Sequence, residues 1–197
     1  LSKEEWLLNI DNYEQQELVT KNKLISSYKI KEKNFNINYT ARIYNVNMTK
    51  YSKFEETDLP LMLQIGSQLK HLSILQIKGF SPINFKHKKN PVLFTEFVSN
   101  GNLSDLFEKQ RKIPNLNLMS DTKKLINIYG IASGMKYIHS QDIIHCQLQT
   151  SSIFLDSNLY PKIFEFGHSQ KVSKPQKQVK YNTTTEPSFI APEIWER

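Results

Sequence analysis

The chain has 197 residues, of which 39% are hydrophobic, and a formal net charge of +7. This length suits one domain or one two-lobed domain. The single cysteine, Cys146, excludes an internal disulfide framework and a metal site built from several cysteines, and it favours a reducing compartment such as the cytoplasm. No apolar run approaches the roughly 18 residues of a membrane helix, and the scattered lysines match no nucleic-acid-binding pattern. We therefore expect neither a membrane nor a nucleic acid as a partner.

The first half of the chain is expected to form short strands and one helix. Alternation with period two, or a short apolar run, predicts strands over residues 28–31, 39–44, 74–80 and 92–98. Residues 59–69 carry Leu61, Ile65 and Leu69 at helical spacing, and Pro60 would lie in the first turn of that helix.

The second half is expected to be mainly helical. Asn100-Gly101-Asn102 predicts a turn before a short helix, and Asp121 is placed to cap a longer one. The expected buried face of that longer helix consists of Leu125, Ile128, Ala132, Met135 and Ile138. Two apolar runs, 153–155 and 162–164, predict a small hairpin, and the polar segment 168–188 predicts a loop.

Four motifs lie in this second half, in a fixed order. Residues 143–153 have the spacing of H-R-D-L-x-x-x-N, and residues 162–167 have that of D-F-G. Residues 191–193 spell A-P-E, and residues 95–103 are similar to a kinase hinge. From about Asn12 onward, the chain resembles a eukaryotic protein kinase domain, most closely the serine/threonine and tyrosine-kinase-like members.

The resemblance implies an α+β fold with two lobes. It predicts a β-rich N-lobe with one helix over residues 1–98, which includes the start of the hinge, and it places the first strand over residues 13–19. An incomplete, mainly helical C-lobe would cover residues 99–197. Two unlike lobes of this kind usually bind a ligand in the cleft between them.

In the N-lobe, the resemblance places unusual residues at the positions that handle phosphate. The glycine positions of G-x-G-x-x-G fall on Thr20, Asn22 and Ile25, which are too bulky for a backbone that must approach a triphosphate closely. The lysine of the third strand falls on Arg42, and its usual helix glutamate falls on Met62. We therefore expect no carboxylate from that helix, and no ion pair, to hold Arg42.

In the C-lobe, the resemblance replaces the polar catalytic positions. The catalytic aspartate falls on Gln147, the following lysine on Gln149, the metal-binding asparagine on Ser152 and the D-F-G aspartate on Glu165. An amide cannot serve as a general base at neutral pH. His145 and Phe166, by contrast, occupy positions where the family packs its internal spine.

The adenine pocket implied by the resemblance is also altered. The residues that should lie above and below the base are Ser27, Thr40 and Phe154, which make a poor slot for a purine. The backbone groups of Glu96 and Val98 at the hinge could still pair with the edge of a base, because backbone pairing needs no particular side chain.

Each singled-out residue also has an ordinary structural interpretation, which we favour. We expect His145 to be a packed core histidine, Cys146 an ordinary thiol and Arg42 a surface or strand-edge charge rather than a phosphate ligand. Glu165 is expected to be a solvated carboxylate, and at most a lone metal ligand. Thr183, Thr184 and Thr185 lie where kinases are phosphorylated, and we expect them to be unmodified.

Three functional hypotheses follow. The first is a pseudokinase that regulates or scaffolds protein partners, with no cofactor or only weak ATP binding without strict Mg²⁺ dependence. The second is an active protein kinase that transfers phosphate from ATP to Ser, Thr or Tyr, and the third is a non-functional gene fragment. The missing glycines and Gln147 favour the first and third hypotheses over the second.

The ends of the sequence suggest a fragment. The chain begins with Leu1 rather than Met, and only residues 194–197 follow A-P-E. The helices that usually follow this motif would be missing, so we expect an apolar face of the helix over residues 121–139 to lack cover.

Overall fold

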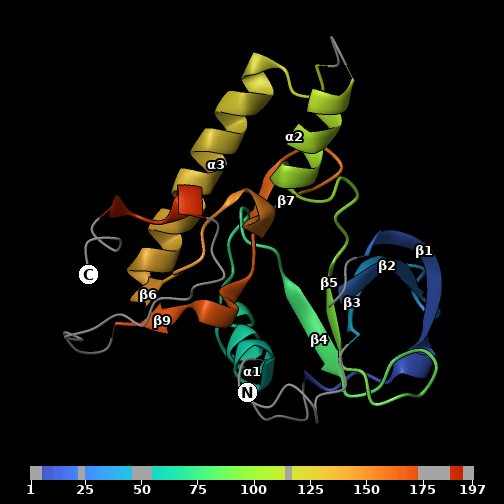
Figure 1. The fold of residues 1–197 in the computed structure, drawn as a ribbon. Coiled ribbons are helices and arrows are strands. Elements are labelled where there is room, and N and C mark those ends of the chain that lie inside the picture. The colour runs from blue at the N-terminus through green and yellow to red at the C-terminus, as the bar shows by residue number, and fades with distance from the viewer. Residues whose placement is uncertain (1–5, 22–24, 46–54, 114–116, 173–186, 193–197) are drawn as a thin grey trace.

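The structure is a computed structural model that describes residues 6–21, 25–45, 55–113, 117–172 and 187–192. It divides into a strand-rich part and a helical part, with the helix α1 (Glu55–Gly66) beside β4 (Figure 1). The motif residues Thr183–Thr185, Asn22 and Glu193 lie outside the described residues.

The strand-rich part is an antiparallel sheet of five strands in the order β1-β2-β3-β5-β4. The strands are β1 (Tyr13–Lys21), β2 (Ile25–Glu32), β3 (Asn38–Tyr44), β4 (Ile77–Ser81) and β5 (Val92–Glu96). They confirm the expected strands, although the ends of each strand differ from the expected ones by up to three residues. β3 lies in the middle of the sheet, so a residue on it is enclosed by β2 and β5.

The helical part contains α2 (Leu103–Lys112) and α3 (Asp121–Ser140). The expected hairpin is present as β7 (Ile153–Leu155) paired with β8 (Pro161–Ile163). A second small pair joins β6 (Ile143–Ile144) to β9 (Gln170–Lys171). Four 3₁₀ turns complete the described elements: η2 (Ile10–Asn12), η3 (Thr150–Ser152), η4 (Phe166–His168) and η5 (Pro187–Phe189).

The buried face of α3 differs from the expected one. Leu125 and Ile128 are 67% and 65% exposed, and Ala132 is exposed as well. Ile138 is buried as expected, and Met135 packs against the core. The other buried residues of the helix are Asn127, Gly130 and Gly134, which were not expected. A Cβ at Gly130 would lie 2.6 Å from Cγ of Pro161, and one at Gly134 2.7 Å from Cδ1 of Ile163. Apolar periodicity failed here because the helix uses glycine to approach the β7–β8 hairpin closely.

Both long helices begin differently from the expectation. α1 starts at Glu55, so Pro60 lies inside the helix rather than in its first turn. Ser120, not Asp121, caps α3, because its hydroxyl accepts a hydrogen bond from the backbone N–H of Lys123 at 3.3 Å. Asp121 is the first helical residue, where a carboxylate faces the positive end of the helix dipole.

The segment before β1 also belongs to the fold, which the sequence pattern did not indicate. The backbone N–H of Leu8 donates to the carbonyl of Phe80 at 2.8 Å, and Leu7 forms a parallel bridge with the same residue. Gly79 allows this approach, since a Cβ there would lie 2.5 Å from Cγ of Leu8. The segment thereby covers part of the edge strand β4.

The two parts of the molecule share one hydrophobic core. The cluster extends from α1, through Leu75 and Ile77, to Ile163 and Phe166. Backbone hydrogen bonds join the same regions: the N–H of Leu75 donates to the carbonyl of Ile163 at 3.0 Å, and the N–H of Ile163 donates to Ser73 at 2.7 Å. These contacts fix the strand-rich part against the β7–β8 hairpin, and the candidate site lies at this junction.

Candidate functional site

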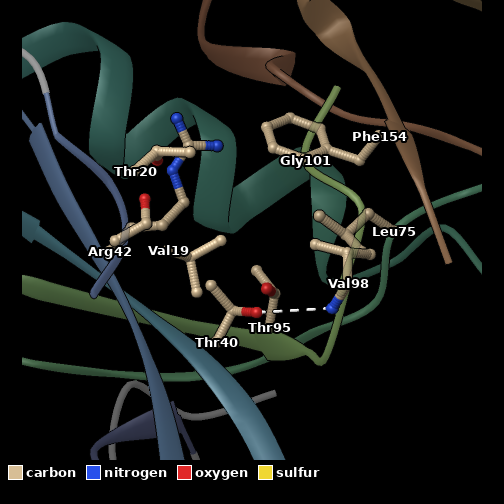
Figure 2. A pocket seen from close by; sticks show the side chains of 10 residues that line it. Val19, Thr20, Thr40, Arg42, Leu75, Thr95, Val98, Gly101 and Phe154 are labelled. Carbon is tan, nitrogen blue, oxygen red and sulfur yellow. Dashed lines mark hydrogen bonds between the residues drawn. The ribbon is translucent and has the colours of Figure 1, made fainter. Parts of the chain in front are cut away.

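A small pocket lies where the sheet meets the hinge and the hairpin (Figure 2). Its lining comes from Val19, Thr20, Ser27, Thr40, Arg42, Leu75, Thr95, Val98, Gly101 and Phe154. The free space is about 10 Å³, which corresponds to roughly one water molecule. Ser27, Thr40 and Phe154 thus line one pocket, as the sequence predicted.

Arg42 forms a buried ion pair that the sequence analysis did not anticipate. Its Nη2 donates to Oε1 of Glu165 at 2.6 Å, and the two side chains are 8% and 25% exposed. The expectation that Arg42 has no ionic partner and lies at a strand edge was therefore wrong. Glu165 is likewise not simply a solvated carboxylate. The pairing was missed because the two residues are 123 positions apart in the sequence.

Two aromatic rings complete the surroundings of Arg42. The guanidinium carbon lies 4.8 Å from the ring centre of Phe164 and 5.4 Å from that of Phe154. Nε and Nη1 of Arg42 are buried and have no hydrogen-bond acceptor. Attraction of the cation to the aromatic faces offsets part of that desolvation. Phe164 is a site residue that the sequence analysis missed, although it lies next to Glu165 within the D-F-G-like segment.

The ion pair also stabilises the charged form of Arg42. Burial by itself disfavours the charged guanidinium, but the adjacent Glu165 carboxylate outweighs this effect and raises the pKa of Arg42 above its ordinary value. Glu165 itself has a positive φ of 68°, which is unfavourable by about 1–2 kcal/mol for a residue other than glycine. Glu165 therefore has a strained backbone conformation at the position where its carboxylate pairs with Arg42.

Met62, at the helix position where the resemblance places a glutamate, is an apolar residue with apolar surroundings. Met62 is 4% exposed and belongs to the main core, and its Sδ lies 4.0 Å from the hydroxyl of Tyr44. Met62 provides no charge to the pocket. The counter-ion of Arg42 comes instead from the opposite side, after β8.

His145 is a packed core residue, as expected. Its Nε2–H donates to the carbonyl of Phe164 at 2.8 Å, and its Nδ1 accepts from the backbone N–H of Gln147 at 3.2 Å. Burial lowers the pKa of His145 to about 4, so the imidazole is neutral at pH 7. Its ring lies 5.2 Å from that of Phe166, which confirms the expected packing of these two residues.

The hydroxyl of Ser152 is fully used within the catalytic-loop segment. It accepts from the backbone N–H of Gln149 at 3.0 Å and donates to the carbonyl of the same residue at 2.8 Å. Ser152 is completely buried. Gln147 is only partly buried, and Oε1 of Gln149 is buried without a hydrogen-bond partner. These three side chains lie in one loop but do not form a polar cluster.

At the hinge, the backbone N–H of Val98 and the backbone carbonyl of Glu96 both have hydrogen-bond partners within the chain. The N–H of Val98 donates to Oγ1 of Thr40 at 3.4 Å (Figure 2). The hydroxyl of Thr95 donates to the carbonyl of Glu96 at 3.1 Å. The carboxylate of Glu96 turns the other way and pairs with Lys162 at 3.2 Å. Thr95 and Lys162 lie within the hinge-like and D-F-G-like segments, but the sequence analysis assigned neither of them a role, because their partners are set by the tertiary structure.

Comparison with known families agrees with the motif order. A family model described as the protein kinase domain matches residues 18–197. The chain belongs to the protein kinase domain family. The five-stranded sheet with α1 is its N-lobe, and α2, α3 and the hairpin belong to a partial C-lobe.

Several curated relatives are protein kinases by name. The serine/threonine-protein kinase PLK4 of Drosophila virilis is 26% identical over 185 residues, which is 94% of this chain and 22% of that protein. PLK4 of Xenopus tropicalis is 32% identical over 132 residues, or 67% of this chain and 13% of that protein. A probable receptor-like protein kinase of Arabidopsis thaliana is 31% identical over 140 residues, or 68% and 16% respectively. The chain thus spans between 13% and 22% of these relatives' lengths.

A nucleotide with its metal ion, which the kinase fold implies, does not fit the residues of this pocket. The free volume is about that of one water molecule, and the hinge groups already have partners. Glu165 is engaged by Arg42, and Ser152 by Gln149. In the part of the chain that the structure describes, no three His, Cys, Asp or Glu side chains cluster as a metal site, and no helix is long and apolar enough to cross a membrane.

Cys146 shows no sign of activation. The thiol is partly buried, and burial raises its pKa. A raised pKa lowers the fraction of reactive thiolate at neutral pH, which agrees with the expectation of an ordinary thiol.

Proposed function

We propose that this kinase domain is a pseudokinase, which transfers no phosphate and acts as a regulatory or scaffolding module for protein partners. The observation that carries this proposal is the Arg42–Glu165 ion pair at 2.6 Å. In phosphoryl transfer, the corresponding lysine handles phosphates and the corresponding aspartate holds Mg²⁺. Here the two side chains neutralise each other, so neither is free for that task.

The catalytic loop supports the same conclusion. Gln147 occupies the position of the residue that accepts the proton of the substrate hydroxyl, and an amide cannot accept it. Loss of a general base alone lowers rates by roughly 10²–10⁴-fold. Since charge neutralisation around the phosphates is the main remaining source of catalysis, its loss at Arg42 and Glu165 removes what Gln147 leaves.

Protein partners are proposed from the surface. Leu125, Ile128 and Tyr129 on α3 are all more than 60% exposed, and grouped apolar side chains of this kind are typical of surfaces that bind protein. The relatives named above are protein kinases, and they favour an active kinase as the second candidate function.

A turnover assay separates the two candidates. The purified chain is incubated with labelled ATP, Mg²⁺ or Mn²⁺ and generic protein substrates, beside a Gln147→Ala variant. We expect equal background incorporation for both proteins. Incorporation above that of the Gln147→Ala variant would contradict the pseudokinase proposal and support the active kinase.

Nucleotide binding is tested by thermal unfolding. A ligand at one hundred times its Kd adds about 2.7 kcal/mol, which would raise the Tm of a domain of this size by about 5–10 °C. We expect millimolar ATP to produce no such shift, with or without Mg²⁺. A small shift that does not need Mg²⁺ would indicate the weak binding considered above. A clear Mg²⁺-dependent shift that Arg42→Ala abolishes would contradict the proposal.

A further inference from the structure

Two ion pairs of opposite polarity join the lobes at neighbouring points. Arg42 on β3 pairs with Glu165 after β8, and Glu96 at the end of β5 pairs with Lys162 on β8 at 3.2 Å. In the first pair the positive charge belongs to the sheet, and in the second it belongs to the hairpin. Among the residues of these pairs, only Glu96 and Glu165 are more than a fifth exposed, at 29% and 25%.

Backbone hydrogen bonds lie between these pairs. Ile163, next to Lys162 in β8, accepts from the N–H of Leu75 at 3.0 Å and donates to the carbonyl of Ser73 at 2.7 Å. Hinged lobes usually close around a ligand, whose contacts to both sides stabilise the closed form. In this chain the contacts that cross between the lobes come from the protein itself.

We propose that the Arg42–Glu165 and Glu96–Lys162 pairs form an interlobe clasp, which holds the two lobes closed on each other without a nucleotide. The alternating polarity also determines the relative position of the lobes. A displacement along β8 that moved Lys162 toward Arg42 would bring like charges together, which disfavours any other register. The domain would therefore present one constant surface to its partners. Only this statement about partners rests on the proposed function; the clasp itself does not.

Hydrogen exchange at Leu75 and Ile163 measures the closure directly, because both amides donate across the lobe boundary. In the free wild-type chain, we expect both amides to exchange as slowly as the amides that pair β2 with β3, and millimolar Mg-ATP to leave them unchanged. Fast exchange at Leu75 and Ile163 in the free chain would overturn the clasp.

Two variants test the charges. Glu165→Gln preserves shape and removes the charge facing Arg42, and Lys162→Met removes the more accessible pair. We expect each to speed exchange at Leu75 and Ile163 by about tenfold or more, with the β2–β3 amides unchanged. Lys124→Met is the matched control, since it removes an ion pair with Asp121 that lies wholly within α3, and it should leave both amides slow.

The outcomes distinguish the clasp from the proposed function. Suppose that the amides of Leu75 and Ile163 exchange slowly in the free chain and quickly in the variants, and that the turnover assay detects catalysis. The clasp then stands and the pseudokinase proposal fails. If the variants speed exchange equally throughout the sheet, the ion pairs contribute only general stability and the clasp is overturned. Unchanged exchange in both variants overturns it as well.

Discussion

The spine and the pocket are neighbouring regions of this kinase fold with opposite properties. We use "spine" for the stacked residues His145, Phe166 and Ile77, with Gly66 between the last two. A Cβ at Gly66 would lie 2.7 Å from Cδ1 of Ile77 and 3.3 Å from Cδ2 of Phe166. The pocket, by contrast, has free space, a long 3.4 Å hydrogen bond and buried donors without acceptors.

The difference shows which demands each region meets. The spine requires shape, apolar surface and, at His145, two hydrogen bonds within the chain, because its task is to join α1 to the C-lobe. The pocket of an active kinase requires specific polar atoms at fixed positions, and here the corresponding atoms pair with one another. The residues that stabilise the fold are thus separate from those at the catalytic positions, as the proposed function requires.

The largest expected effect is in the spine. Phe166→Ala removes a side chain with no exposed surface, and such a truncation lowers the free energy of unfolding by about 3–5 kcal/mol. Denaturant unfolding measures the change. Phe107→Ala, on the 48% exposed side chain of α2, is the control and should cost less than about 1 kcal/mol. Similar losses in both variants would contradict the distinct role of the spine.

The next effect is a pH dependence that originates at His145. The unfolded chain binds a proton at this histidine below about pH 6.5, whereas burial keeps the folded imidazole neutral until about pH 4. Stability is therefore complete above pH 6.5 and is lost as the pH falls toward 4, by up to about 1.4 kcal/mol per pH unit. His145→Phe can still pack against Phe166 but cannot titrate.

Unfolding curves between pH 4 and 7.5 test this difference. The His145→Phe variant should have lower stability at pH 7, because it loses the hydrogen bonds to Phe164 and Gln147, but a flatter dependence on pH. Parallel curves for the two proteins would show that another group causes the acid sensitivity.

The smallest expected effect is in the pocket. Thr40→Ala removes the acceptor of a 3.4 Å hydrogen bond from Val98, and we expect a loss of about 1 kcal/mol or less in the free energy of unfolding. Thr122→Ala on the exposed side of α3 is the matched control, with an expected change within about 0.5 kcal/mol. A loss above about 3 kcal/mol for Thr40→Ala would mean that the pocket is packed as tightly as the spine.

Much of the fold was predictable because its signals are local. Alternation and short apolar runs identified four of the five sheet strands, two apolar runs identified the hairpin, and Gly101 has the positive φ of 68° that a turn with glycine permits. The core face of α3 was not predictable from periodicity. Gly130 and Gly134 carry no apolar signal, yet they allow the closest approach, whereas the apolar Leu125 and Ile128 face outward.

The sequence by itself determined the order of the elements, the kinase motifs and the identity of the residues that occupy the catalytic positions. It did not determine that Arg42 and Glu165 meet, because an ion pair across 123 positions has no local pattern. It also did not indicate that Thr40 and Thr95 use the hinge backbone, or that Leu8 covers the edge of β4. Only the tertiary structure decides these contacts, since burial removes water as a competing partner and leaves each polar group to pair with whatever the packing brings near.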